Sequence, residues 1–356
     1  EVFFGNASFV DKNRLAVKNL DGSQVEIVSE NFVIATGGKP QKLSFIEDSN
    51  DIWYYKEALQ PTDIPKKLLV VGSGAIGVEF ASFYNQMGSD VTLLESQDRI
   101  VPNEDSDVSS FVEKQFLNKK IKIFKNSVLK EVNKKSKGVN AVFMVDERKH
   151  DFEYNKIIIA VGIAGNIEEL NIEVTGINSE NKRIVVDDYC RTNVENIFAI
   201  GDVASAPWLA HKASHEGVVV AELIAGEKPN PIKRENIPAC TFCDPEIASI
   251  GLTEEKVKQE KLDFKTGIFP FSANGKALAM GYKDGFIKTI IDRKTGEILG
   301  VHMVGAGVTE LIHNFSLVKE AEIIQENIEN TIFPHPTLSE AIHESVLKAS
   351  GKEIHI

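Results

Sequence analysis

The fold class follows from residues 68–77, which read LLVVGSGAIG. Four aliphatic residues in a row are typical of a strand that is buried on both faces of a parallel sheet. Three glycines with the spacing Gly-x-Gly-x-x-Gly follow at once, and a helical pattern continues from them to about Met87. A second apolar strand, residues 91–94, ends at Glu95. The stretch therefore predicts one complete strand–helix–strand unit of an α/β protein.

The glycines of this unit predict a dinucleotide site. Gly72 allows the tight turn, Gly74 lets backbone N–H groups approach a pyrophosphate, and Gly77 lets the helix pack closely on the strand. The helix N-terminus adds partial positive charge for the phosphates. Glu95 would accept hydrogen bonds from a ribose diol and repel a 2′-phosphate, and the nearest base after it is the lone Arg99, so NAD is favoured over NADP. The alternative is a glycine turn in an unrelated α/β protein.

Length and composition limit the possible classes of protein. The chain has 356 residues, which is two to three domains at roughly 150 residues each. Hydrophobic residues make up 42% and charged residues 26%, as in an ordinary globular protein. A net charge of −12 argues against nucleic-acid binding, and no apolar run approaches the ~18 residues of a membrane helix. Three cysteines are too few for a disulfide framework and favour a reducing compartment.

Two other predicted strands stop at small residues, in the sequences ATGG at residues 35–38 and AIGD at residues 199–202. Such ends let a flat ligand pass close to the backbone, and Asp202 could bind hydroxyl groups there. The alternative for either end is a simple turn from strand to loop.

A possible catalytic motif, HPTLSE, occupies residues 335–340. His335 could move protons near neutral pH, and a carboxylate on one ring nitrogen would fix its tautomer and make it more basic. The spacing of Thr337 and Glu340 is also that of a capping box at the start of the last helix, expected at residues 338–349. Both interpretations can hold, because the cap would orient Glu340.

Taken in order, these motifs resemble the pyridine nucleotide–disulfide oxidoreductase family, and within it the branch that oxidises dihydrolipoamide. Three further stretches support the resemblance: LAHKA at 209–213, FPFSANG at 269–275 and GVHMVG at 300–305. Leu338-Ser339 and Glu95 favour this branch over glutathione reductase. The resemblance covers essentially the whole chain.

The resemblance implies an α/β fold with Rossmann-like domains and a C-terminal α+β dimerisation domain. The expected division is a remnant of the FAD-binding domain (1–60), the NAD-binding domain (61–165), a central segment returning to the FAD domain (166–235) and the dimerisation domain (236–356). The implied partners are a second copy of the chain and the lipoyl domains of 2-oxo-acid dehydrogenase complexes. The bacterial cytoplasm and the mitochondrial matrix are both compatible locations.

The resemblance also implies a reaction and site residues. Dihydrolipoamide would reduce an enzyme disulfide, from which electrons pass through FAD to NAD. His335 matches the acid–base histidine and Glu340 the glutamate that orients it, and in the family this pair reaches into the partner subunit's site. The implied cofactor contacts are Glu79 near the nicotinamide, Gly162 on the NAD side, Thr36 and Gly37 at FAD, Gly201 and Asp202 at the flavin ribityl chain, and Leu209, Ala210 and His211 beside the flavin.

Two features depart from the family pattern. The chain has neither an FAD glycine fingerprint nor the redox pair Cys-x4-Cys, and we expect both in sequence preceding Glu1. Retention of FAD by these 356 residues alone is therefore expected to be weak or absent. Many relatives also carry Arg after the glycine of Val161-Gly162-Ile163, which here is followed by Ile.

Some alternatives stay open. Cys240-x-x-Cys243 could indicate a thioredoxin-like or zinc site, although a strand with two incidental thiols is favoured because no second ligand pair exists. His211 and His215 have helical metal-ligand spacing, but no third ligand motif follows, so no metal is expected. The function could also be that of mercuric or another disulfide reductase, or of an NAD-binding, dimerising module without redox chemistry.

Overall fold

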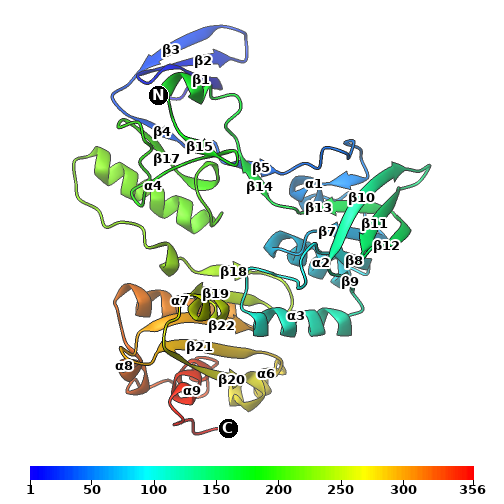
Figure 1. Cartoon of the computed structure of the whole chain (residues 1–356), viewed down its shortest axis with the longest axis vertical. Coiled ribbons are helices and arrows are strands. Elements are labelled where there is room, and N and C mark those ends of the chain that lie inside the picture. Colours follow the sequence, from blue (N-terminus) through cyan, green and yellow to red (C-terminus); the bar gives the residue numbers. More distant parts are fainter. The chain divides into compact units, whose positions relative to one another are not determined.

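The structure, a computed structural model, describes residues 1–356, and the chain forms two compact units. The first consists of Glu1–Gln41 and Gly162–Arg234, and the second of Lys42–Val161 and Glu235–Ile356 (Figure 1). No helix in either unit is long and apolar enough to cross a membrane.

The first unit contains small sheets around one core. Its strands are β1 (Gly5–Asp11), β2 (Arg14–Asn19), β3 (Gln24–Val28), β4 (Phe32–Ile34), β5 (Gly38–Pro40), β14 (Ile163–Gly165), β15 (Ser179–Glu180), β16 (Arg183–Ile184) and β17 (Ile197–Ala199), and its helices are η1 (Ile172–Thr175), η2 (Gly201–Val203) and α4 (Ala210–Ile224). β1, β2 and β3 form an antiparallel sheet, β4 and β17 pair in parallel, and β14 with β5 and β15 with β16 pair antiparallel. Phe32, Ile197 and Val203 lie in the core.

The second unit begins with a parallel sheet. Its strands are β6 (Ile52–Trp53), β7 (Lys67–Val71), β8 (Asp90–Leu94), β9 (Lys122–Phe124) and β13 (Lys156–Ile159), in the order β6-β13-β7-β8-β9. The helices of this part are α1 (Tyr55–Leu59), α2 (Ala75–Gln86) and α3 (Ser106–Asn118). Leu68, Leu69 and Val70 have no exposed surface, as a doubly covered strand requires. The observed α/β class is the predicted one.

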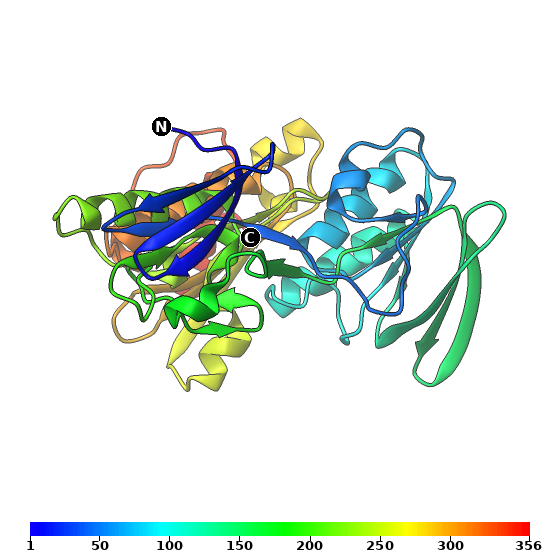
Figure 2. The ribbon, with the colours of Figure 1, turned by 90° about the horizontal axis from the view of Figure 1, so that it is seen from above.

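An antiparallel sheet of β10 (Ser127–Lys134), β11 (Val139–Val145) and β12 (Arg148–Tyr154) adjoins the parallel sheet. It projects at the outer edge of this part of the unit (Figure 2). The sequence of residues 128–145 predicts an antiparallel hairpin, which is present as β10 and β11, and β12 adds a third strand that was not predicted.

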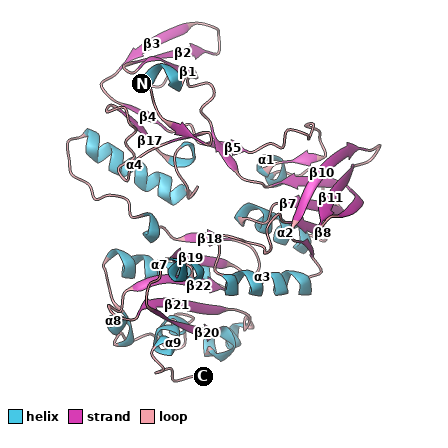
Figure 3. Ribbon diagram, viewed as in Figure 1, coloured by secondary structure: helices cyan, strands magenta, loops and turns pink.

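The rest of the second unit is a five-stranded antiparallel sheet in the order β18-β19-β22-β21-β20 (Figure 3). Its elements are β18 (Ala239–Thr241), β19 (Ile247–Gly251), β20 (Phe264–Pro270), β21 (Phe286–Asp292) and β22 (Ile298–Val304), with α5 (Glu254–Gln259), η4 (Phe271–Ala273), α6 (Gly275–Met280), α7 (Val308–Glu320), α8 (Gln325–Glu329) and α9 (Glu340–Ala349); η3 (Arg234–Asn236) precedes them along the chain.

Both faces of this antiparallel sheet are buried. Ile287, Val301 and Met303 pack in one cluster with residues of α7 and α9. Their neighbours Phe286 and Val304 point to the other face of the sheet. There they pack with residues of α3, in the core that covers the parallel sheet. The two parts of the second unit therefore share a continuous hydrophobic core.

Several element boundaries differ from those predicted. The parallel sheet starts with β6, before the domain boundary expected at residue 61, because β6 pairs with β13. The pattern of residues 308–324 predicts one helix over that range, but α7 ends at Glu320, since Glu322 adopts φ 53°, a left-handed conformation through which a helix does not continue. Helix α3 was not predicted at all.

Candidate functional site

Two glycines of the Gly-x-Gly-x-x-Gly motif, one in the turn after β7 and one in the first turn of α2, are required by packing. Gly72 has φ 98°, a left-handed conformation, and a Cβ there would lie 2.4 Å from the carbonyl oxygen of Ala160. A Cβ at Gly77 would lie 1.9 Å from the carbonyl oxygen of Gly72. No larger side chain fits either position without a backbone shift, so both glycines keep the strand and the helix in close contact.

Gly74, in contrast, faces open space. It is the N-cap of α2, with φ −65° and ψ −177°, and no neighbouring atom lies within 4 Å of the position that a Cβ would take. The first N–H groups of a helix have no partner inside it and carry partial positive charge. The open space at this helix start fits the pyrophosphate of a dinucleotide.

Glu95 lies at the end of β8, beside this loop, and is 6% exposed. One carboxylate oxygen accepts the N–H of Ser73 (3.0 Å) and its hydroxyl (2.6 Å), and the other accepts from Gln97 N–H (2.9 Å) and the Ser96 hydroxyl (3.1 Å). Burial works to raise the pKa of Glu95, but these hydrogen bonds hold it below its ordinary value, so the carboxylate is ionised at neutral pH. A ribose diol would have to compete with these donors. The role of Ser73 was not predicted, although its place inside the glycine motif was a usable signal.

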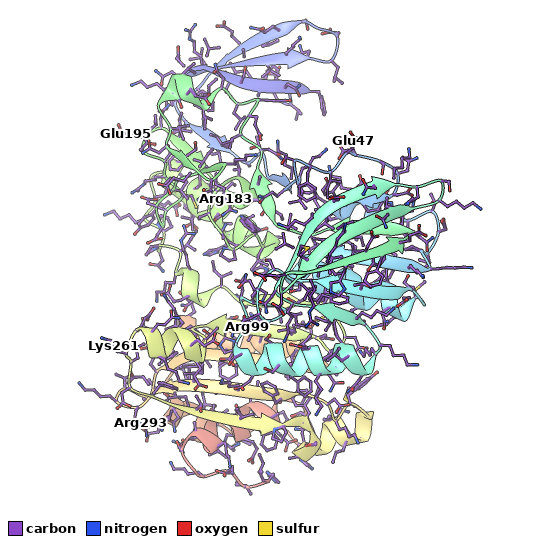
Figure 4. All side chains as sticks on the ribbon, turned by 45° about the vertical axis from the view of Figure 1, so that its right-hand side comes forward. Glu47, Arg99, Arg183, Glu195, Lys261 and Arg293 are labelled. Carbon is purple, nitrogen blue, oxygen red and sulfur yellow. The ribbon has the colours of Figure 1, made fainter.

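Arg99 is already engaged. Its guanidinium donates to a carboxylate oxygen of Glu255 at 2.7 Å and to the carbonyl of Pro102 at 3.1 Å, and it is labelled in Figure 4. A cation held in this way is poorly placed to bind a 2′-phosphate, which agrees with the preference for NAD.

Glu79, predicted near the nicotinamide, lies on α2. Its carboxylate accepts the backbone N–H of Phe242 at 2.8 Å, immediately after β18. Burial raises the pKa of Glu79, and the hydrogen bond from Phe242 only partly opposes this effect. The side chain therefore ties α2 to the antiparallel sheet, and its contact with a nicotinamide stays a prediction.

In the first unit, the two predicted strand ends lie side by side. β4 and β17 are parallel neighbours whose last residues are paired, so the loops after them leave the same edge. A Cβ at Gly38 would lie 3.1 Å from the Cβ of Asp202. Gly37 and Gly201 both adopt left-handed conformations, with φ 70° and 72°. The fold thus brings together Gly37, Gly201 and Asp202, which the resemblance assigns to FAD.

Two other predicted contacts have their polar groups engaged inside the first unit. The Thr36 hydroxyl donates to the carbonyl of Asn166 at 2.8 Å, and the Asn166 amide donates back to the carbonyl of Thr36 at 3.0 Å. The carbonyl of Gly162, which has φ 117°, accepts the N–H of Gln41 at 2.9 Å. These bonds fix the local backbone, and the contact of Thr36 and Gly162 with a cofactor stays a prediction.

Residues 209–211 form the start of α4, where Leu209 is the N-cap. Further along α4, Glu216 accepts the N–H of Gly201 at 2.7 Å and pairs with Lys212 at 2.7 Å. Both side chains of this ion pair are 1% exposed. This pair was not predicted, although a lysine and a glutamate four positions apart on one helix are a signal that the sequence contains.

His335 and Glu340 are brought together as predicted. Nδ1 of His335 lies 2.8 Å from Oε1 of Glu340, whose other oxygen accepts the N–H of Thr337 at 2.9 Å. Burial works to raise the pKa of Glu340, but the bonds from Thr337 and His335 lower it, so the group is a carboxylate. A carboxylate can only accept, so Nδ1 carries the proton and Nε2 presents a lone pair. The histidine side chain is 76% exposed, which leaves Nε2 open to a substrate.

The capping-box prediction is only half right. Glu340 does accept the Thr337 N–H, but the N-cap of α9 is Ser339, and the helix begins at Glu340. The Thr337 hydroxyl donates to the carbonyl of Pro334 at 2.7 Å and therefore does not cap the helix. In the short loop before α9, the acceptor of this hydroxyl is the Pro334 carbonyl and not a backbone group of the helix.

None of the three cysteines suits a redox pair. All are reduced, and Cys190 and Cys243 are buried. Burial raises the pKa of Cys190 to about 12, and it also raises the pKa values of Cys240 and Cys243. A thiol that stays protonated at neutral pH is a poor nucleophile. Across residues 1–356, no group of three or more His, Cys, Asp or Glu side chains is arranged to hold a metal ion.

The geometry agrees with two family models. One, described as pyridine nucleotide-disulphide oxidoreductase, matches residues 1–217, and the model of the dimerisation domain of the same family matches residues 237–346. The chain therefore belongs to the pyridine nucleotide-disulphide oxidoreductase family. Its dihydrolipoyl dehydrogenase members use FAD and NAD.

Among individual relatives, the chain is 44% identical to the dihydrolipoyl dehydrogenase of Zymomonas mobilis over 358 residues, which cover 100% of this chain and 77% of that protein. It is 45% identical to the dihydrolipoyl dehydrogenase of Rhizobium etli over 361 residues, which cover 100% of this chain and 75% of that protein.

Two examples among the matching solved structures each have a TM-score of 0.88. LpdA from Mycobacterium tuberculosis is 27% identical, with 96% of this chain and 75% of that chain covered. The HOCl-induced flavoprotein disulfide reductase RclA from Escherichia coli is 26% identical, with 97% of this chain and 79% of that chain covered.

Proposed function

We propose that this protein is a dihydrolipoyl dehydrogenase, which oxidises dihydrolipoamide through an enzyme disulfide and FAD and reduces NAD⁺. The observation that carries the proposal is the His335–Glu340 pair, 2.8 Å apart, in a chain that aligns along its whole length with two dihydrolipoyl dehydrogenases. The ionised Glu95 and the engaged Arg99 support NAD as the nucleotide.

His335 supplies the proton transfer in this proposal. A thiol of dihydrolipoamide must lose its proton before the sulfur attacks the enzyme disulfide. Nε2 of His335 takes that proton, and Glu340 stabilises the imidazolium that results. Exchange leaves lipoamide as a disulfide and the enzyme as a dithiol. FAD, when bound, carries the two electrons from this dithiol to NAD⁺.

The residues described above would hold both cofactors. The loop of Gly72, Gly74 and Gly77 would bind the pyrophosphate of NAD, with Glu95 at the ribose. The paired ends of β4 and β17, with Asp202, would hold the ribityl part of FAD.

We further propose that the protein acts as a homodimer and serves the lipoyl domains of 2-oxo-acid dehydrogenase complexes. The match to the dimerisation domain supports the first part. The exposure of the His335 loop agrees with it, because Ile332 is 94% exposed and the His335 side chain is 76% exposed.

The test is turnover by the full-length, FAD-loaded protein. We expect NAD⁺-dependent oxidation of dihydrolipoamide, with NADP⁺ at least ~100-fold less efficient because Glu95 repels a 2′-phosphate. Equal rates with both nucleotides would contradict the NAD assignment. No turnover with dihydrolipoamide would contradict the substrate assignment.

The structural match to RclA favours one second candidate, a reductase of another disulfide. The same preparation distinguishes the two. Reduction of a different disulfide with NADH, together with no activity on lipoamide, would support the second candidate.

A further inference from the structure

Two glutamates of helix α9, one turn apart, each bind the ring of a histidine that lies outside the helix. Glu340 and Glu344 are four residues apart, so they lie on the same face of the helix. Glu340 holds His335 at 2.8 Å, and Glu344 holds Nδ1 of His355 at 2.7 Å. The first pair belongs to the site described above. The second pair, His355–Glu344, transfers no proton in the proposed reaction.

The second pair is built into the fold. Glu344 is 4% exposed, and its Oε2 also accepts the backbone N–H groups of Ile354 (3.0 Å) and His355 (3.4 Å). Three hydrogen bonds from the C-terminal segment therefore converge on one buried carboxylate. They fix the segment, residues 352–356, against α9 and set the position of the His355 ring, which is 62% exposed.

Other charges near this segment are already paired. Lys348 of α9 pairs with Glu353, and Lys352 pairs with Glu329 of α8 at 2.8 Å. The carboxylates that interact with the charge of His355 are Glu344, which binds its ring at 2.7 Å, and Glu340, one helical turn away. Burial works to raise the pKa of Glu340, and Thr337, His335 and finally the charge of His355 lower it. His355 thus acts electrostatically on the carboxylate that orients His335.

We propose that His355 is a positioning residue for His335: anchored on Glu344, it places a titratable positive charge one helical turn from the His335–Glu340 pair. The inference rests on the proposed function, because it assigns His335 the proton transfer. It deepens that function by making the charge around the dyad depend on the C-terminal segment.

The sign of the effect follows from Coulomb's law. An ordinary histidine is protonated below about pH 6.5. A positive charge at His355 disfavours a second positive charge at His335 and so helps His335 to remain a free base in acid. Removing that charge should therefore make His335 protonate at higher pH. For charges near a protein surface the expected shift is about 0.5 pH unit.

The test uses two substitutions in the full-length, FAD-loaded protein. In His355→Gln, which keeps a polar side chain without the charge, we expect the acid limb of the kcat/KM profile for dihydrolipoamide to move up by about 0.5 pH unit. In His355→Lys, which stays charged, we expect the limb at or below its wild-type position. Salt of ~1 M should reduce the difference, because exposed charges are screened. A purely structural role would lower stability but leave the limb in place.

A second readout does not depend on turnover. The chain has eight histidines, so the ring signals can be followed by NMR in protein labelled at histidine. We expect the titration midpoint of the His335 ring to move up in His355→Gln and not in His355→Lys. Unchanged midpoints in both variants, or equal shifts in both, would overturn the inference. Failure of wild-type protein to oxidise dihydrolipoamide would overturn the proposed function instead, and the NMR comparison would still decide the coupling.

Discussion

At the scale of single residues, the site depends on an exposed base with a fixed tautomer. Glu340 holds the Nδ1 proton of His335, and the backbone N–H of Thr337 holds Glu340. The carboxylate thus has one oxygen for the histidine and one for the loop. This division explains how a side chain that is 76% exposed keeps one orientation.

We expect His335→Ala in the full-length protein to slow lipoamide turnover by at least ~100-fold, the usual size of a general acid–base contribution. Glu340→Gln should give an intermediate loss, since the amide can still accept from Nδ1 but carries no charge to stabilise the imidazolium. Steady-state kinetics measure both effects. His313→Ala, an exposed histidine on α7, is the control and should leave the rate unchanged. Wild-type turnover in His335→Ala would remove this residue from the mechanism.

At the scale of elements, the three glycines between the end of β7 and the first turn of α2 have different roles. Gly72 and Gly77 are required because a Cβ at either would meet backbone atoms of the loop or of the neighbouring strand. Gly74 has a backbone conformation open to any residue and free space around it. The first two serve the fold, and the third serves the ligand.

This difference predicts opposite results for two alanine substitutions. Gly74→Ala should fold with an unchanged melting temperature and bind NAD⁺ at least ~10-fold more weakly, because the methyl group occupies the space for the pyrophosphate. Gly77→Ala should lose about 3 kcal/mol of stability or more, since backbone atoms must move to admit the methyl group. Calorimetry and NAD⁺ titration measure both. The same loss of stability in the two variants would contradict the assignment.

At the scale of the whole molecule, a buried lysine joins the two parts of the second unit. Lys288 on β21 has a side chain that is 1% exposed and donates to Asp105 (2.8 Å) and Asp107 (2.6 Å), and it pairs with Glu254 (2.7 Å). Burial alone would lower the pKa of Lys288, but these bonds raise it. Burial works to raise the pKa values of Asp105 and Glu254, and bonds that include those to Lys288 hold both below their ordinary values.

Lys288→Met should therefore cost about 3–5 kcal/mol of unfolding free energy at neutral pH, because it leaves the buried Asp105 without its counter-ion. The carboxylates have lowered pKa values, so their contribution is complete above about pH 4 and is lost as the pH falls through those values. The cost should shrink accordingly below about pH 4. Urea unfolding across this range measures it, with the exposed Lys294→Met as control. A cost independent of pH would contradict the ionic explanation.

Much of the fold was readable because its signals are local. The aliphatic run of β7, the glycine spacing and the acidic residue after β8 lie within 30 residues, and their roles follow from backbone geometry. Helix α3 was missed, although Val108, Val112 and Phe116 recur at helical spacing, because its polar residues hide the pattern. The pairing of His335 with Glu340 was identified from residue types, whereas Thr337 fails to cap α9 because its hydroxyl donates to the carbonyl of Pro334, a bond that the sequence did not indicate.

The residue types and their spacing along the chain were sufficient to predict the α/β class, the dinucleotide loop, the His335–Glu340 pair and the family. Each of these predictions requires only residues that are neighbours in sequence. Contacts between distant residues were not readable in this way. Lys288 and Asp105 are 183 positions apart, and a lysine inside a strand gives no sign that three carboxylates will surround it. The same holds for His355, whose place beside the Glu340 dyad depends on the chain end folding back onto α9. Such placements come from packing, which pairs side chains by space and charge rather than by their order in the chain.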